Sequence, residues 1–350
     1  MRILYSFLCL WAFALTAVLA SETNAQEKRP LKVFLLAGQS NMQGHAHIRT
    51  LDHLGKDPKY GHLLKKIKNE NGTWVTRKDV WVAYPERKKY GNLTVGYGAN
   101  DQKVGPMLMF GTIIGDYYKD HQVLIIKTAW GGRSVAVDFR PPSSGRITFE
   151  IKGGLAKRLQ KDPEAVGKTY REMVSQVRDV LKNLKQHFPQ YQGQGYEIVG
   201  FAWFQGWNDM INQTFVDEYS KNLANLIRDL RKDLNVPKMK VVIGELSVGG
   251  ENKKNKRMLA FRKAQADVAE VPEFKGTVAF VPTVKYWDVD AHEFLQKNWV
   301  RRKWSSPEAK KKWETMGSNY PFHYMGSGKV YSLIGYGLAE SMKELVMKKE

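Results

Sequence analysis

The sequence contains one cysteine, Cys9, in 350 residues, which excludes a disulfide-stabilised scaffold and any metal cluster held by cysteines. Acidic residues are also in deficit: 35 Asp and Glu stand against 55 Lys and Arg, giving a formal net charge of +20. Such an excess favours polyanionic partners or acidic surroundings without identifying either. Because 43% of the residues are hydrophobic and 12% aromatic, the chain can bury a full core, and a wholly disordered protein is excluded.

Long apolar runs are absent after the first segment of the chain, so we expect no stable membrane span there. At the N-terminus, Arg2 precedes an uncharged run over residues 3–19, and small residues follow at Ala20 and Ala25. This order is typical of a secretory signal peptide, which we assign to residues 1–25, with cleavage after Ala20 as the alternative. The mature chain is then exported to the periplasm or the medium. A retained membrane anchor is the competing interpretation, although the run is short for a bilayer.

Apolar runs of strand length alternate with amphipathic helical patterns along the expected mature chain, residues 26–350. The predicted strands cover residues 31–37, 122–129, 198–204, 240–246 and 277–284. The predicted helices cover residues 170–184, 215–230, 256–270 and 330–347. This alternation predicts an α/β fold with a mostly parallel sheet of about five strands and helices on both faces.

No fixed-period repeat and no linker rich in Pro or Ser divides residues 26–350, so we expect a single domain. Two segments, residues 48–101 and 139–163, do not fit the alternation of strands and helices. We therefore expect them to be insertions that lie over one edge of the sheet.

Segments rich in Gly, Ser, Asn and Gln follow four of the predicted strands. They are residues 38–44 (GQSNMQG), 130–134 (WGGRS), 205–209 (QGWND) and 247–250 (SVGG). In an open parallel sheet, ligands bind beyond the carboxyl ends of the strands, so these segments should meet at one edge. Backbone N–H groups and side-chain amides gathered there can stabilise an oxyanion, although each cluster alone could be a simple turn. The sequence therefore predicts a site at this edge.

Ser40 directly follows the first predicted strand and is the candidate nucleophile of this site. A serine nucleophile needs a base within hydrogen-bond reach, usually a histidine. His323 lies in a turn-rich segment just before the last predicted helix, where the chain should return to the same sheet edge; capping that helix is its alternative role. His45 and His47 have a spacing that could hold a metal, but without a clear third ligand we predict no metal site.

The segment VFLLAGQSNMQG, residues 33–44, closely resembles the first block of the sialate O-acetylesterase and acetylxylan esterase-like branch of the SGNH hydrolases. Further segments resemble the other blocks of that group in the same order: GPMLMFG at 105–111, WGGRS at 130–134, WFQG at 203–206, and His323 before the final helix. The matching segments extend over nearly all of the expected mature chain.

This resemblance implies a three-layer α/β/α fold of the flavodoxin-like kind and a hydrolase that removes O-acyl groups, often acetyl, from carbohydrate without a cofactor. It implies that Ser40 is the nucleophile and His323 the general base. It also implies an oxyanion hole formed by the main-chain N–H groups of Ser40 and Gly132 and by the side-chain amide of Gln205.

One departure from the pattern of that group concerns the residue behind the histidine. Many relatives have an aspartate three residues before it, where this chain has Tyr320. Asn319 is the nearest polar residue and could orient His323, and Glu245 and Asp288 are alternatives that only the fold can decide. Each of these two carboxylates could instead have a structural role, one at a strand end and the other as a helix cap.

A second departure is Trp207, which stands where the group often has a glutamate. Together with Trp130, Trp203 and Tyr97 it could form an aromatic platform for a sugar ring. The competing interpretation is that these rings belong to the core. Trp130 and Trp207 are the candidate substrate-binding residues.

The sequence thus predicts an exported serine esterase that acts on O-acylated oligo- or polysaccharide. The basic excess favours an acidic carbohydrate as the partner, and the lack of any recognised binding motif argues against nucleic acid. A catalytically silent glycan-binding protein on the same fold is the main alternative, favoured by the missing aspartate. A serine hydrolase or transferase for non-sugar acyl groups is the second alternative.

Overall fold

A seven-stranded sheet forms the centre of the computed structural model, which describes residues 29–348. The predicted signal peptide and Cys9 lie outside the described residues. The strand order is β4-β3-β6-β1-β7-β8-β9, and neighbouring strands are parallel except for the pair β3 and β4. The strands are β1 (Leu31–Gly38), β3 (Arg77–Tyr84), β4 (Lys89–Leu93), β6 (Val123–Ala129), β7 (Tyr196–Phe204), β8 (Lys240–Gly244) and β9 (Val278–Val281). The expected α/β class with a mostly parallel sheet is confirmed.

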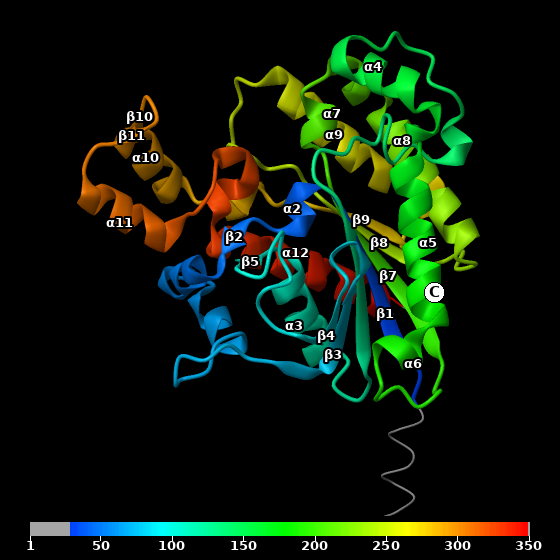
Figure 1. Ribbon diagram of the computed structural model, residues 1–350, viewed down its shortest axis with the longest axis horizontal. Helices are drawn as coiled ribbons and strands as arrows, with labels where there is room; N and C mark the ends of the chain where they lie inside the picture. Colours follow the sequence, from blue (N-terminus) through cyan, green and yellow to red (C-terminus); the bar gives the residue numbers. More distant parts are fainter. Residues whose placement is uncertain (1–28, 349–350) are drawn as a thin grey trace, which may run out of the picture.

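Helices cover both faces of this sheet (Figure 1). One face carries α3 (Met107–Tyr117) and α12 (Gly328–Met347). These two helices approach closely at Gly335, where a Cβ atom would overlap the carbonyl oxygen of Pro106. The other face carries α5 (Lys168–Lys182), α8 (Gln213–Asp233) and α9 (Lys256–Ala269). The three-layer α/β/α arrangement is therefore confirmed.

Residues 48–101 are more than an insertion over the sheet edge, because they supply β3 and β4, the two outermost strands on one side. In β3 the last five residues form a buried run that follows charged residues, and this mixture hid the strand from the sequence pattern. The sheet consequently has seven strands rather than about five. Residues 139–163 contain α4 (Gly153–Lys161), which lies beyond the carboxyl edge of the sheet (Figure 1).

A segment between β9 and α12, which the sequence pattern left unassigned, projects from the body of the molecule (Figure 1). It contains α10 (Val289–Asn298), the antiparallel hairpin of β10 (Trp299–Val300) and β11 (Lys303–Trp304), and α11 (Pro307–Met316). A second short antiparallel pair joins β2 (Ala46–His47) to β5 (Lys103–Val104). Across residues 29–348, every helix is too short or too polar for a membrane span.

Candidate active site

Ser40 lies at the carboxyl end of β1, as the first residue of the short helix α2 (Ser40–Gln43). The chain turns sharply here because Gly38 packs against β7, where a side chain would overlap the carbonyl oxygen of Phe204. Only 9% of Ser40 is exposed, and its hydroxyl has no hydrogen-bond partner among the described residues. The hydroxyl is therefore free to engage a ligand.

A cavity of about 350 Å³ lies at this edge of the sheet. Ser40 and His323, which are far apart in the sequence, both line it. Its lining consists of Gln39, Ser40, Gln43, His45, Gly131, Gly132, Trp207, Asn208, Phe322 and His323. Asn41 ties the two segments together: its Nδ2 donates to the carbonyl oxygen of Phe322 at 3.2 Å, and its Oδ1 accepts from the Tyr331 hydroxyl at 2.8 Å. The predicted nucleophile and base thus face one space.

His323 is held by a tight turn that precedes α12. Tyr324 and Met325, which follow it, have φ angles of 51° and 59°. Non-glycine residues seldom adopt this left-handed conformation, and both side chains are fully buried. Strained backbone of this kind clusters at functional sites, where surrounding packing enforces it.

Asn319 fixes the protonation of the His323 ring. The Asn319 Oδ1 atom accepts the N–H of Tyr320 at 2.7 Å, which identifies it as the oxygen of the amide. The same oxygen lies 3.2 Å from His323 Nδ1, so Nδ1 must carry the proton that it donates. The lone pair is then on Nε2, which has no partner among the described residues. The predicted orienting role of Asn319 thus has a geometric basis.

The ring of His45 stacks on the ring of His323, with 3.9 Å between ring centres and an angle of 7° between planes. Burial, aided by the positive charge of Lys103, lowers the pKa of His323 to about 4. The pKa of His45 is lowered to about 3, mainly by burial and to a smaller extent by the positive charges of His323, Lys103 and Lys127. Lys103 Nζ lies 3.4 Å from His45 Nδ1 and can only donate, so the proton of neutral His45 is on Nε2. Both imidazoles are therefore neutral near pH 7.

The two carboxylates proposed as alternative partners of His323 lie elsewhere in the structure. Glu245 accepts the N–H of Val284 at 3.0 Å and lies 3.7 Å from the guanidinium of Arg262. Asp288 caps α10 by accepting the N–H of Ala291, and it also pairs with His53 at 2.8 Å and with Lys329 at 3.3 Å. Neither carboxylate contacts His323, and this corrects the expectation that one of them could orient it.

Asn208 provides a side-chain amide at the cavity. It lies in α7 (Trp207–Met210), directly after β7. Its Oδ1 accepts from Gln39 Nε2 at 3.2 Å, and its Nδ2 donates to the carbonyl oxygen of Gly132, also at 3.2 Å. The second N–H of Asn208 remains available to the cavity. Gly132 lines the same space with a φ of 69°, a conformation suited to glycine.

Gln205, the expected third donor of the oxyanion hole, is occupied elsewhere. Its Nε2 donates to the carbonyl oxygen of Arg133 at 2.9 Å and to Asp209 at 2.5 Å, and its Oε1 accepts from the Tyr219 hydroxyl. The side chain is buried beneath the cavity rather than part of its lining. The amide that lines the cavity is therefore that of Asn208, three positions further on, which the sequence analysis did not single out.

Of the aromatic residues expected to bind a sugar, Trp207 lines the cavity and Trp130 does not. The Trp130 indole is buried and donates to Glu86 at 2.6 Å. Trp203 and Tyr97 are likewise buried, as the competing core interpretation expected. A ring that the sequence analysis overlooked, Phe322, lies 5.9 Å from Trp207 and completes an aromatic wall of the cavity.

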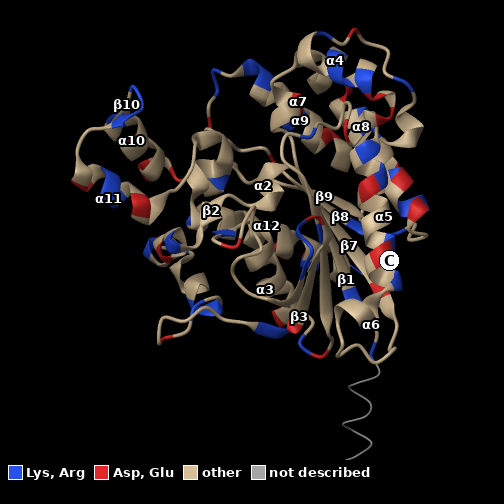
Figure 2. Ribbon diagram, in the orientation of Figure 1, with Lys and Arg blue, Asp and Glu red and all other residues tan. Residues whose placement is uncertain are grey.

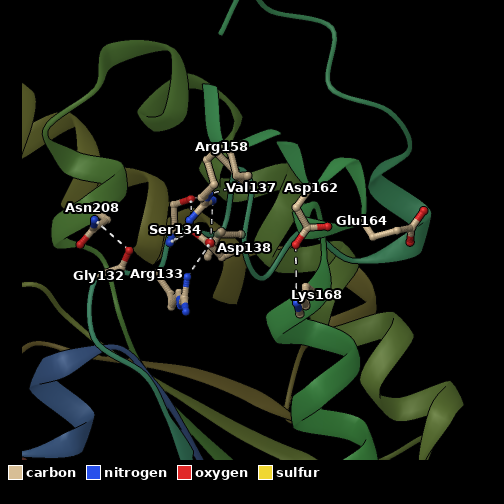
Figure 3. A network of polar contacts seen from close by, with 12 residues as sticks. Gly132, Arg133, Ser134, Val137, Asp138, Arg158, Asp162, Glu164, Lys168 and Asn208 are labelled. Atoms are coloured by element: carbon tan, nitrogen blue, oxygen red, sulfur yellow. Dashed lines mark hydrogen bonds and ion pairs between the residues drawn. The ribbon is translucent and has the colours of Figure 1, made fainter. Parts of the chain in front are cut away.

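A second cavity, of about 840 Å³, adjoins the first and shares Gly132 and Asn208 with it. Figure 3 shows the polar network on its wall, in which Asp138 accepts from Ser134 and from Arg158 of α4, both at 2.9 Å. Asp138 also lies 3.4 Å from Arg133, so two guanidinium groups share one carboxylate. Across the lining of this cavity, the charges of Lys152 and Arg158 balance those of Asp138 and Glu150.

A serine, a histidine and amide groups gathered at the carboxyl edge of a parallel α/β/α sheet form the arrangement of the SGNH hydrolase fold. The family model for carbohydrate esterases described as sialic acid-specific acetylesterases matches residues 30–283. The chain belongs to this family, and the resemblance seen in its sequence is confirmed. Family membership supports an esterase that acts on carbohydrate. His323 lies beyond the matched residues.

Individual proteins are similar to this chain at low sequence identity. A probable carbohydrate esterase of Arabidopsis thaliana is 23% identical over 221 residues, which make up 63% of this chain and 71% of the relative. An X-ray structure of an Arabidopsis thaliana protein has a TM-score of 0.49 and 16% identity, with 90% of this chain and 98% of that chain covered. The structure of a carbohydrate acetylesterase from Xanthomonas citri has a TM-score of 0.45 and 12% identity. The match covers 73% of this chain and 50% of that chain.

Proposed function

We propose that the protein is an exported serine esterase that removes O-acetyl groups from carbohydrate through an acyl-enzyme. The observation that carries the proposal is the shared cavity of Ser40 and His323, in which Asn319 keeps the proton on Nδ1 and leaves Nε2 free. Family membership supports the class of reaction. No hydrogen bond joins the two side chains among the described residues, as is common before substrate binds.

In the first half of the reaction, His323 Nε2 takes the hydroxyl proton of Ser40 while Oγ attacks the carbonyl carbon of the ester. The main-chain N–H groups of Ser40 and Gly132 and the side-chain amide of Asn208 hold the oxyanion that forms. When the intermediate collapses, the bond between the carbonyl carbon and the sugar oxygen breaks. The departing oxygen takes the proton from His323, and Ser40 keeps the acetyl group.

In the second half, a water molecule gives a proton to His323 Nε2 and attacks the acetyl carbon. The same donors hold the second oxyanion. Ser40 Oγ then leaves and takes back the proton, so that acetate is released and the enzyme is restored. Throughout, the neutral amide of Asn319 orients His323 but stabilises its positive charge less than a carboxylate would.

The proposed substrate places its ester in the smaller cavity and its saccharide in the adjoining larger one. Trp207 and Phe322 offer ring faces for the sugar beside the ester. The formal net charge of +20 on the chain favours an acidic sugar. Activity on an acetylated, uronate-bearing glycan should therefore fall as salt rises, and activity on neutral acetylated xylan should fall less.

The test of the proposed function is acetate release by the wild type and two matched variants, Ser40→Ala and Ser220→Ala. Ser220 lies in α8 and lines neither cavity, so it serves as the control. The substrates are 4-nitrophenyl acetate, acetylated xylan, O-acetylated sialic acid and a simple lipid ester. We expect carbohydrate ester cleavage that only Ser40→Ala abolishes. Glycan binding without any hydrolysis would favour the silent binding protein, and a preference for the lipid would favour a non-sugar esterase.

Export is tested separately, because it depends on residues 1–25. When a cell produces the full sequence, the protein should be found outside the cytoplasm. Its N-terminus should then be Gln26. N-terminal sequencing checks this. An intact N-terminus retained in the membrane would instead favour the anchor interpretation.

A further inference from the structure

An aromatic cluster lies in the projecting segment between β9 and α12. The hairpin of β10 and β11 pairs Trp299 with Trp304, and their ring centres lie 6.4 Å apart. Trp304 lies 6.0 Å from Trp313 of α11, and Trp299 lies 5.7 Å from Tyr320. Tyr320 is 52% exposed, which is unusual for so large a ring in a cluster of this kind. Trp313 belongs to the hydrophobic core and Trp299 and Trp304 pack against it, whereas Tyr320 lies outside the core. The proposed reaction uses none of these four rings.

These rings enclose a cavity of about 320 Å³ that also contains polar groups. Ser318 and Asn319 line it beside Trp299, Trp304 and Tyr320. Aromatic walls with a few polar groups are typical of small-ligand sites. A sugar ring fits this chemistry, because its C–H faces can pack on aromatic rings while its hydroxyl edges bond to polar groups.

The cavity is connected to the active site by a continuous series of ring contacts. The Tyr320 ring stacks on that of Phe322, with 5.4 Å between centres and an angle of 10° between planes. Phe322 in turn lies 5.9 Å from Trp207, and both line the cavity of Ser40. Asn319 belongs to both places, since it lines the aromatic cavity and bonds to His323. A chain of sugars could therefore contact both cavities.

The segment that carries most of the aromatic cavity has an excess of basic residues. Residues 289–316 contain seven Lys and Arg but only four Asp and Glu. Arg301, Arg302 and Lys303 form the exposed tip of the hairpin, and within the described part of the chain their side chains make no ion pair or hydrogen bond. Figure 2 shows this basic tip at β10 and further basic residues on α11. Unpaired guanidinium groups beside an aromatic cavity are suited to carboxylate or sulfate groups on a saccharide.

We propose that the cavity of Trp299, Trp304 and Tyr320 is a second saccharide subsite, which binds a neighbouring sugar of an acidic polysaccharide while the active site holds the acetylated sugar. The inference rests on the proposed function for the role of the subsite, but the residues that form it lie beyond those matched by the family model. The subsite would make the protein an enzyme for polymeric substrates rather than for single acetylated sugars.

Binding is tested without catalysis, in the Ser40→Ala background, by native affinity electrophoresis in gels that contain xylan or polygalacturonate. Loss of an aromatic stacking contact should weaken retention by about 2- to 10-fold in Tyr320→Ala and Trp299→Ala, and Trp299→Phe should restore it. Tyr320→Ala is informative even if the tryptophan variants fold poorly, because Tyr320 is exposed. Trp74→Ala, which removes a tryptophan outside both cavities, is the matched control.

The charged rim is tested with the double variant Arg301→Gln, Arg302→Gln. It should lose retention by polygalacturonate and keep retention by xylan. The assignment to an acidic saccharide would be overturned if retention fell equally on both polymers, or if retention by polygalacturonate did not fall. Retention unchanged in Tyr320→Ala and Trp299→Ala would overturn the subsite itself.

Kinetics then connect the subsite to the reaction. The readout is the ratio of kcat/KM on acetylated polysaccharide to kcat/KM on 4-nitrophenyl acetate. We expect Trp299→Ala to lower this ratio, mainly through KM on the polymer, and Trp299→Phe to recover it. An unchanged ratio in an active enzyme contradicts the subsite. Polymer retention that depends on Trp299, in a wild type that hydrolyses no ester, would contradict the proposed function and leave the subsite standing.

Discussion

The rings of His45 and His323 lie face to face, 3.9 Å apart at their centres and 7° from parallel. In the proposed reaction His323 takes the Ser40 proton, and its positive charge then forms against the face of a ring that stays neutral, since burial lowers the pKa of His45 to about 3. A cation over a π face is stabilised electrostatically. The stack thus supplements Asn319, whose neutral amide is a weaker partner for an imidazolium than a carboxylate.

The first prediction concerns the face of His45. His45→Leu removes the aromatic ring. His45→Phe keeps an aromatic ring and introduces a side chain about as apolar as leucine. We expect His45→Leu to lower kcat on 4-nitrophenyl acetate by roughly 2- to 30-fold, the equivalent of roughly 0.5–2 kcal/mol, and His45→Phe to lose less. His47→Leu, two residues away and outside the cavity lining, is the control. Equal activity of the Leu and Phe variants would argue against the stack.

The second prediction concerns pH. His323 must be neutral to accept a proton, so kcat/KM should fall as the pH drops through its pKa of about 4. Burial is the main cause of this low pKa and Lys103 contributes, so Lys103→Met should raise the pKa and shift the acid limb of the profile to higher pH. Lys275→Met, on the exposed surface, should leave the limb in place. A shift of the limb to lower pH in Lys103→Met would contradict the assignment of His323 as the base.

The third prediction concerns the partner of His323. Asn319→Ala removes the oxygen that holds the proton on Nδ1, so the productive tautomer is lost in part and kcat should fall. Asn319→Asp supplies a carboxylate at the same place, which should raise the pKa of His323 and move the acid limb of the kcat/KM profile to higher pH. A profile of Asn319→Asp that is superimposable on the wild type would show that residue 319 does not contact the base in solution.

The fourth prediction separates Asn208 from Gln205. Asn208→Ala removes a donor from the oxyanion hole and should lower kcat by about 10²- to 10³-fold, with little change in Tm. Gln205→Ala instead breaks a buried hydrogen-bond network with Asp209 and Tyr219, so its main effect should be a lower Tm. Thermal unfolding and steady-state kinetics on both variants check this. The reverse pattern would return the donor role to Gln205.

The sequence predicts the central sheet and the turn that carries Ser40, the proposed nucleophile, because both are encoded locally. β6 is buried at all seven residues and begins with an apolar run over residues 123–126, and the turn of Ser40 follows β1 directly. β3 escapes detection because only its last five residues are apolar and buried. The hairpin of Trp299 and Trp304 escapes because its strands are only two residues long.

The partners within the site depend on tertiary contacts that no local pattern contains. Gln205 and Asn208 lie three residues apart in a segment rich in polar side chains, and only the position of Asp209 beneath the loop decides which amide faces the cavity. In the same way, the pairing of Asp288 with His53 joins residues 235 positions apart. The signal that could have identified Asn208 is its place directly after the Gly206 turn, at the end of β7.

The most direct test of the central claim is to trap the acyl-enzyme. The wild type is mixed with 4-nitrophenyl acetate, quenched in acid within the first turnover, digested and analysed by mass spectrometry. We predict one acetyl group on the peptide that contains Ser40, and none in a sample allowed to complete turnover. Steady hydrolysis with no acetyl group on that peptide, or with the label on another residue, would contradict the account.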